Sequence, residues 1–387
     1  MKYRTTLSEA TVTFEGREQS YRELCMDESL TDAELDEIDT QYYNKYSEEL
    51  GEIYIGLVGV RQELAAYLGF DSFEELAYVW YYDRDYTPAQ ADALISDIRT
   101  YIVPLYREAN ERGLWDKMEY QPMTEETVLS KIGLLADRLG GDIKESFDYM
   151  KEHRLYDISV SPQKMDMSYQ TYLSTYESPV IFVKAEGYDD DCLAVAHEFG
   201  HFVDSYVNYN TTYSVELAEV VSHSMEYFLI SRLPQTGDLE RIKLLDTLDT
   251  YAQQASFAEF ERRVYEIPAD KLTVDRINEI SLETAQEFGY ADEGREEYYA
   301  KSWIDITHFF EYPFYVISYC VSNDAAFQIY QLELTKKGDG LAQFNSLLPR
   351  RYDGFLDSLE NQSDLESPFA PGRMEKTADT VRSQLYD

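Results

Sequence analysis

The stretch DDDCLAVAHEFGHFVDSYV, residues 189–207, contains two histidines four residues apart, His197 and His201. On a helix, residues at this spacing differ by about 40° in phase and by one turn in height, so both imidazoles can face one metal ion. Glu198 follows the first histidine and can reach a water molecule on such an ion to take its proton. Apolar residues over 194–196 suit a buried helix. Because the chain has only five histidines, chance is a poor explanation for this pattern.

A catalytic zinc ion usually has three protein ligands and one open position, so a third ligand is expected from the following helix. That segment reads ELAEVVSHSME over residues 216–226. One broad helical stripe, at spacings of three, four and seven, contains Glu219, Ser222, His223 and Glu226. The remaining residues are largely apolar, and acids on a mostly buried helix need a cation. Spacing alone favours Glu219 as the third ligand, with Glu216, His223 and Glu226 as alternatives.

A second candidate group lies in residues 304–330, IDITHFFEYPFYVISYCVSNDAAFQIY. Hydrolysis of a peptide bond develops an oxyanion, which a tyrosine hydroxyl or a histidine N–H can stabilise. His308, Tyr312, Tyr315 and Tyr319 could supply such donors. An aromatic stripe at helical spacing is more often part of a core, so the sequence leaves both interpretations open.

The composition excludes several classes of function. With 74 acidic and 34 basic side chains, the formal net charge is −40, and such a surface repels phosphate backbones. Nucleic-acid binding is therefore not expected. No apolar run is long enough to span a membrane, and the start MKYRTTLSEA is unlike a signal peptide, so we expect a cytoplasmic protein. Three widely spaced cysteines form neither a disulfide framework nor a thiolate zinc cluster. The 35 tyrosines could serve a core or a polar cleft.

Helical periodicity dominates the chain. A helix over 50–69 should end at Gly69, and Ser72 and Thr87 should begin further helices. Two helices are expected over 123–154, broken at the pair of glycines at 140–141, and a small strand region over 155–187. Longer helices are expected over 190–208, 213–233, 238–263, 272–288 and 294–335. We expect an N-terminal helical lobe over 1–115, a catalytic region over 116–357 and a loosely packed polar tail over 358–387, with the lobes in one body.

Six blocks of sequence, taken in order, resemble a family of zinc peptidases that contains thimet oligopeptidase and oligoendopeptidase F. These blocks lie at residues 61–87, 167–187, 197–201, 218–226, 257–261 and 308–319. The resemblance implies a mainly α-helical, two-lobed fold with a deep substrate channel and a small β-sheet near the active site. It also implies one zinc ion, oligopeptide substrates and an N-terminal lobe that is truncated relative to the family.

Residue by residue, the resemblance implies that His197, His201 and Glu219 are zinc ligands, that Glu198 is the general base and that Glu226 orients a ligand. It further implies that His308 contacts substrate and that Tyr315 or Tyr319 donates to the oxyanion. The chain departs from the family at two positions: Asp204 stands where a histidine is usual, and Ile317 stands where oligoendopeptidase F has a tyrosine.

The function expected from these residues is zinc-dependent hydrolysis of internal peptide bonds in short, unstructured oligopeptides. A zinc carboxypeptidase of a related helical fold is one alternative. It would need a positive group for the substrate carboxylate, and residues 308–330 contain no Arg or Lys. A peptide-binding protein that kept the fold but lost catalysis is the other alternative, and the complete set of metal-site residues argues against it.

Overall fold

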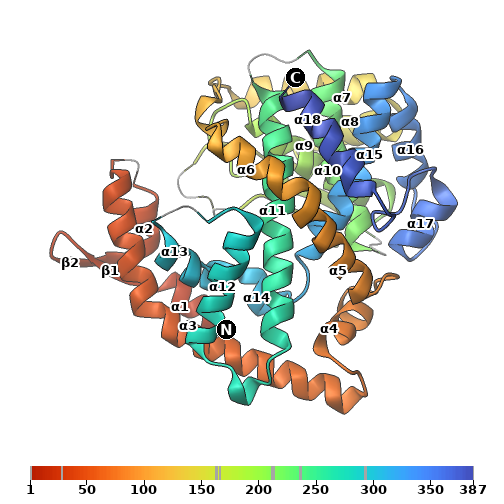
Figure 1. Cartoon of the computed structure of the whole chain (residues 1–387). Coiled ribbons are helices and arrows are strands. Elements are labelled where there is room, and N and C mark those ends of the chain that lie inside the picture. The colour runs from red at the N-terminus through yellow and green to blue at the C-terminus, as the bar shows by residue number, and fades with distance from the viewer. Residues whose placement is uncertain are drawn as a thin grey trace. The chain divides into compact units, whose positions relative to one another are not determined.

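The structure is a computed structural model that describes residues 2–27, 29–161, 164, 167–210, 214–234, 238–291 and 294–386. The chain divides into two compact units (Figure 1), and each unit is built from two separate segments. Unit 1 comprises Met1–Tyr81 and Gln253–Ile317, and unit 2 comprises Tyr82–Ala252 and Ser318–Asp387. The fold is mainly helical with only small sheets, as predicted. The division differs from the expected boundaries at 115 and 357, because segments distant in sequence complete each core.

Unit 1 has one long helix, α3, around which shorter elements pack. Helix α3 begins at the capping box of Thr31 with Glu34 and ends at Gly69, whose φ of 85° permits the left-handed cap that the sequence predicted. The other elements of unit 1 are α1 (Lys2–Ser8), β1 (Thr11–Phe14), β2 (Arg17–Ser20), α2 (Tyr21–Cys25), α3 itself (Asp32–Leu68), α4 (Phe73–Leu76), η1 (Ala77–Tyr81), the second part of α11 (Leu239–Tyr265), η4 (Ala269–Lys271), α12 (Val274–Phe288), α13 (Glu296–Lys301), η5 (Ser302–Asp305) and α14 (Thr307–Glu311).

Aromatic rings from both segments form the core of unit 1. The Tyr54 ring on α3 lies 5.2 Å from the rings of both Trp303 and Phe310. The hydroxyl groups of Tyr42 and Tyr43 donate to the two carboxylate oxygens of Asp305, at 2.6 and 2.7 Å. Part of the tyrosine content therefore serves this core, and the hydroxyls of Tyr42 and Tyr43 share an acidic partner there.

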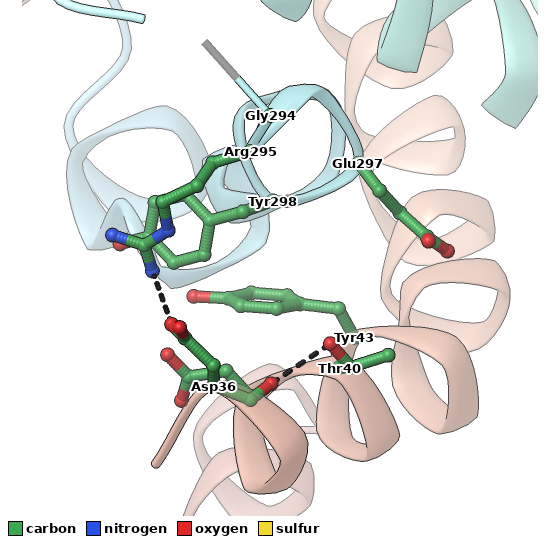
Figure 2. A pocket seen from close by; sticks show the side chains of 8 residues that line it. Asp36, Thr40, Tyr43, Gly294, Arg295, Glu297 and Tyr298 are labelled. Carbon is green, nitrogen blue, oxygen red and sulfur yellow. Dashed lines mark hydrogen bonds and ion pairs between the residues drawn. The ribbon is translucent and has the colours of Figure 1, made fainter. Parts of the chain in front are cut away.

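Unit 1 also has a polar hollow of about 200 Å³ between α3 and α13 (Figure 2). Arg295 lies over the Tyr298 ring, 4.3 Å from its centroid, and its Nη2 is 3.2 Å from Asp36 Oδ1. The Arg295 guanidinium in this hollow is thus already paired with a carboxylate of the same chain. None of the lining residues belongs to the candidate metal ligands, which lie in unit 2.

Unit 2 carries the predicted metal-binding helices and a small sheet. Its elements are α5 (Pro88–Asp97), η2 (Ile98–Ile102), α6 (Val103–Glu111), η3 (Trp115–Lys117), α7 (Glu125–Leu139), α8 (Gly141–His153), β3 (Tyr156–Asp157), β4 (Tyr169–Leu173), β5 (Ser178–Phe182), α9 (Asp191–Val207), α10 (Val215–Arg232), the first part of α11, α15 (Ile317–Thr335), α16 (Asp339–Leu347), α17 (Phe355–Gln362) and α18 (Arg373–Leu385). In the sheet, β5 pairs antiparallel with β4 and parallel with β3. The strand region predicted over 155–187 is confirmed.

Two expectations about the C-terminal third are wrong. The single helix expected over 294–335 is interrupted before α15, where Phe314 adopts a left-handed φ of 61°. The tail expected to be loose instead ends in α18, which buries Met374 and Val381 completely. The Arg373 guanidinium at its start forms a buried ion pair with Asp324 of α15, 3.0 Å from Nε to Oδ2. This pair and the apolar face hold the helix in unit 2. Among the described helices, none is long and apolar enough to cross a membrane.

Candidate active site

Helix α9 carries three of the predicted site residues and begins at a well-ordered turn. The carboxylate of Asp191 accepts hydrogen bonds from the backbone N–H groups of residues 186–188 at 2.8 to 3.2 Å. An acid in the first turn also complements the positive end of the helix dipole. His197, Glu198 and His201 follow on the next two turns of the same helix.

Helices α9 and α10 approach each other closely at Gly200. A Cβ atom on Gly200 would lie 2.4 Å from the Cα of Ser222 and 2.9 Å from the carbonyl oxygen of Val221. Only glycine can occupy this position without moving α10. The close packing brings Glu219, one turn before Ser222, opposite the two histidines.

The structure brings together the three predicted ligands. The Nε2 atoms of His197 and His201 lie 3.5 and 3.6 Å from the same oxygen, Oε2 of Glu219. All three potential ligand atoms lie within 4.8 Å of one another, which is the spacing expected around one ion. The hydroxyl of Ser222 donates to Glu219 Oε2 at 3.1 Å and so orients this carboxylate.

Glu226 determines which nitrogen of the neutral His197 ring carries the proton. His197 Nδ1 lies 2.8 Å from Glu226 Oε1, so Nδ1 carries the proton toward this carboxylate; in the neutral imidazole, Nε2, which faces Glu219, then keeps the lone pair. Burial works to lower the pKa of His197, but the hydrogen bond and charge of Glu226, with further acids nearby, raise it to about 9. For His201, burial outweighs the attraction of Glu219 and lowers the pKa to about 4. Two imidazoles and a carboxylate are a donor set that suits zinc.

Glu198 is buried beside the histidines, and one of its carboxylate oxygens lacks a hydrogen bond among the described residues. Its side chain is only 5% exposed, and among the described residues Oε2 has no hydrogen-bond partner. Burial raises its pKa to about 7, with Glu219 and Glu226 adding to the shift against the opposing effect of His197. A carboxylate with a pKa near neutrality can both accept and return a proton.

Glu216, the first alternative as third ligand, has a different partner. Its Oε1 lies 2.9 Å from Nε of Arg84 and accepts from the hydroxyl of Tyr86 at 2.7 Å. Burial works to raise the pKa of Glu216, but the Arg84 charge together with the hydrogen bonds from Tyr86 and Ser318 lowers it. Glu216 therefore serves a buried ion pair rather than the histidine group.

The other two alternatives, His223 and Glu226, contact each other. His223 Nδ1 lies 3.1 Å from Glu226 Oε1, the oxygen that also faces His197. The second oxygen of Glu226, Oε2, lies 2.7 Å from Nζ of Lys243 on α11. Glu226 thus lies against Nδ1 of His197, and the role of orienting this candidate ligand stays a prediction. The sequence reasoning missed Lys243, although a lysine within the apolar run IKLL at 242–245 was a usable signal.

Comparison with known proteins identifies proteins of similar sequence and fold. No protein-family model matches the chain. The chromosomal oligoendopeptidase F of Lactococcus lactis subsp. cremoris is 26% identical over 211 residues, which cover 50% of this chain and 34% of that protein. The match therefore spans about a third of the curated relative's length.

Solved structures of similar fold cover the chain almost completely. A crystal structure of an oligoendopeptidase F superposes with a TM-score of 0.82 at 24% identity, covering 99% of this chain and 74% of that one. Pz peptidase A with an inhibitor gives 0.83 at 22% identity, over 99% and 74% of the two chains. Oligoendopeptidase F from Bacillus anthracis strain Ames gives 0.78 at 22% identity, over 100% and 73%. The chain has the oligoendopeptidase F fold. The resemblance inferred from the ordered sequence blocks is confirmed.

Asp204, which stands where the family usually has a histidine, forms a buried ion pair. Asp204 Oδ1 lies 2.6 Å from Nη2 of Arg350, and Asn208 also donates to it at 2.9 Å. This acid fastens the end of α9 to the segment that follows α16. The second departure, Ile317, is buried at the start of α15 and packs as an apolar residue.

Of the four aromatic residues considered as donors, His308, Tyr312 and Tyr315 belong to unit 1, whereas the histidine group belongs to unit 2. His308 is half-buried, with its ring 5.3 Å from that of Tyr315 and 6.1 Å from that of the exposed Tyr312. Tyr319 belongs to unit 2 and is half-buried on α15. These four residues are thus divided between the two units.

The turn before Tyr315 depends on an acid that the sequence reasoning did not single out. Both carboxylate oxygens of Glu261 on α11 lie 3.0 Å from the backbone N of Phe314, the residue with φ of 61°. Glu261 is fully buried and therefore holds this turn from within unit 1. The sequence block FAEFE over 257–261 resembles the family but does not by itself indicate a role for this residue.

Proposed function

We propose that this chain is a zinc-dependent metalloendopeptidase that hydrolyses internal bonds of short, unstructured oligopeptides. The observation that carries the proposal is the convergence of His197, His201 and Glu219, beside Oε2 of Glu198, which has no hydrogen-bond partner in the described part of the chain. The names of the similar proteins, oligoendopeptidase F and Pz peptidase A, support peptide-bond hydrolysis.

The residues fit a single zinc ion. Two neutral imidazole nitrogens and one carboxylate oxygen would hold it, and Glu226 behind His197 keeps the Nε2 lone pair available. When bound, zinc polarises a peptide carbonyl and lowers the pKa of water.

Glu198 is proposed as the proton carrier. Its free Oε2 takes a proton from the attacking water and later delivers it to the amine that leaves. His308 and Tyr315 or Tyr319 are proposed as donors to the oxyanion or to the substrate backbone. The net charge of −40 favours basic peptides over acidic ones as substrates. The three described cysteines are free, which supports the proposed cytoplasmic location.

The test is digestion of a quenched peptide library by the wild type, by Glu198→Gln and by chelator-treated enzyme. We expect the wild type and Glu198→Gln each to bind one zinc ion per chain. Turnover by Glu198→Gln should be lower than that of the wild type by about a thousandfold or more. Turnover by Glu198→Gln at the wild-type rate would refute the mechanism.

Peptides with blocked ends separate the proposed activity from its alternative. An endopeptidase cleaves peptides whose C-terminus is amidated, whereas a carboxypeptidase requires the free carboxylate. Mass spectrometry of the products therefore identifies the cleaved bond directly. Zinc binding without cleavage of any peptide would favour a peptide-binding protein that has lost catalysis.

A further inference from the structure

Lys243 is a buried cation that reaches the candidate zinc site through one intermediate residue. Its side chain is 4% exposed, and its Nζ lies 2.7 Å from Oε2 of Glu226, whose side chain is 10% exposed. A lysine is almost never buried to this degree unless its charge is paired. The Glu226 carboxylate, which also contacts His197, is the partner that compensates for burial of the Lys243 charge.

Glu226 receives donors from three helices. Oε1 accepts from Nδ1 of His197 on α9 at 2.8 Å and from Nδ1 of His223 on α10 at 3.1 Å. Oε2 accepts from Lys243 on α11. Each oxygen is therefore held, and the carboxylate cannot rotate without losing at least one charged or buried hydrogen bond.

We propose that Lys243 is a positioning residue for zinc binding, acting on His197 through Glu226. This inference rests on the proposed function. The ammonium fixes the plane of the Glu226 carboxylate and balances its charge, so that Oε1 stays aligned with Nδ1 of His197. Without the ammonium, the buried carboxylate loses its countercharge and turns toward any remaining donor. His197 then loses the partner that keeps its Nε2 aimed at the ion.

The decisive measurement is zinc affinity, determined by competition with a chelator and independent of catalysis. Loss of a residue that orients a ligand typically weakens metal binding by about 10- to 100-fold, and we expect this for Lys243→Met. Lys243→Arg keeps the charge and should restore most of the affinity. If Lys243→Met does not fold, Lys243→Gln keeps a donor without the charge and should show an intermediate loss.

Arg232→Met is the matched control. Arg232 forms an equally buried ion pair with Glu333, 2.7 Å from Nη2 to Oε1, in the same unit and away from the histidines. Its loss should lower stability and leave zinc affinity unchanged. An equal loss of zinc affinity in Arg232→Met would show that Lys243 acts through general stability, and would overturn the inference.

A double variant tests the route through Glu226. If Lys243 acts only through this carboxylate, Glu226→Gln with Lys243→Met should bind zinc no more weakly than Glu226→Gln alone. Additive losses would contradict the proposal, as would Lys243→Met binding zinc within about twofold of the wild type. If the wild type itself bound no zinc, the proposed function would fail, and this inference with it. If the wild type binds zinc and cleaves peptides while Lys243→Met is unchanged, the inference alone fails.

Discussion

Arg84 and Glu216 form an ion pair with almost no exposure on either side, 2.9 Å from Nε to Oε1. The same carboxylate oxygen accepts from the hydroxyls of Tyr86 at 2.7 Å and Ser318 at 2.8 Å. Glu216 stands in the first turn of α10, one helical turn before Glu219. The pair therefore ties the segment before α5 and the beginning of α15 to the helix that carries the third candidate ligand.

Breaking this pair should strongly destabilise unit 2. Arg84→Met leaves the Glu216 carboxylate buried without its countercharge, and we expect a loss of about 3–5 kcal/mol in the free energy of unfolding. Urea denaturation monitored by circular dichroism measures it. The control is Lys144→Met, which removes the exposed ion pair with Asp148 and should change stability by less than about 1 kcal/mol. A loss below about 1 kcal/mol for Arg84→Met would contradict this role.

Gly200→Ala should separate the two helices, α9 and α10, that carry the candidate metal ligands. The added methyl group would meet the Ser222 backbone at 2.4 Å, so α10 must shift. We expect a loss of stability of about 1–3 kcal/mol together with weaker zinc binding, measured by denaturation and chelator competition. Gly56→Ala is the control, because Gly56 lies within α3 and a Cβ there meets no atom within 4 Å. That substitution should stabilise the protein by about 0.5–1 kcal/mol. Unchanged zinc affinity in Gly200→Ala would refute the argument.

The pKa of Glu198 predicts a pH-dependent stability of the metal-free protein. Burial raises this pKa from 4.5 to about 7, so between these values the folded protein holds a proton that the unfolded chain has released. Stability therefore falls as pH rises from 4.5 to 7, and the cost remains above 7. Glu198→Gln should equal the wild type near pH 4 and be more stable by up to about 3 kcal/mol at pH 8.

This pH effect is measured by urea denaturation in the presence of chelator. Glu152→Gln, a substitution at an exposed glutamate on α8, provides the control and should have little effect at either pH. A Glu198→Gln advantage that is the same at pH 4 and pH 8 would show that the raised pKa is not its source.

Glu261 should control catalysis without affecting zinc. Its carboxylate holds the Phe314 turn that leads into Tyr315, a proposed oxyanion donor. We expect Glu261→Leu to lower kcat about tenfold or more at unchanged zinc affinity, since the candidate metal ligands lie in unit 2. Glu261→Gln keeps one acceptor for the Phe314 N–H and should retain more activity. Steady-state kinetics with a quenched peptide would detect the difference, and full activity in Glu261→Leu would exclude this role.

The elements that sequence predicted well are those with local signals. Ser72 and Thr87 accept hydrogen bonds from the N–H groups three residues later, as N-caps do, and Gly69 ends α3. Helices α9 and α10 begin and end within about two residues of their expected bounds, because apolar periodicity reports burial of a helix face. The hairpin of β1 and β2 was missed. Its turn has positive φ at Glu15 and Gly16, and a single Glu-Gly pair is a weak signal in sequence.

The C-terminal helix α18 was missed for a different reason. Met374, Ala378 and Val381 recur at spacings of four and three and form a buried stripe. Charged residues between them lower the average hydropathy of the segment, so the regular spacing of its apolar residues is hard to recognise in the sequence. The apolar pattern, rather than the mean composition, was the informative signal.

In the candidate site, sequence identified the residues with a recognisable spacing but not those that support them. His197, Glu198, His201 and Glu219 are close in sequence and follow helical spacing. The supporting contacts, Lys243 with Glu226 and Arg350 with Asp204, join residues from different elements. A single sequence does not show which distant charges meet, because the pairing depends on how the helices pack. The catalytic roles themselves stay predictions until the variants above are measured.

The segments of the two units alternate along the sequence, and this order has a consequence for the synthesis of the chain on the ribosome. The hydroxyl of Tyr3 donates to the carbonyl of Ile304, a partner 301 residues later in the chain. Unit 1 cannot close until residues 253–317 have emerged, and by then most of unit 2 is already outside the exit tunnel. Unit 2 in turn waits for Arg373 to reach Asp324. A nascent chain therefore carries uncovered aromatic side chains through most of translation, and its yield in the cell should depend on chaperones that shield them.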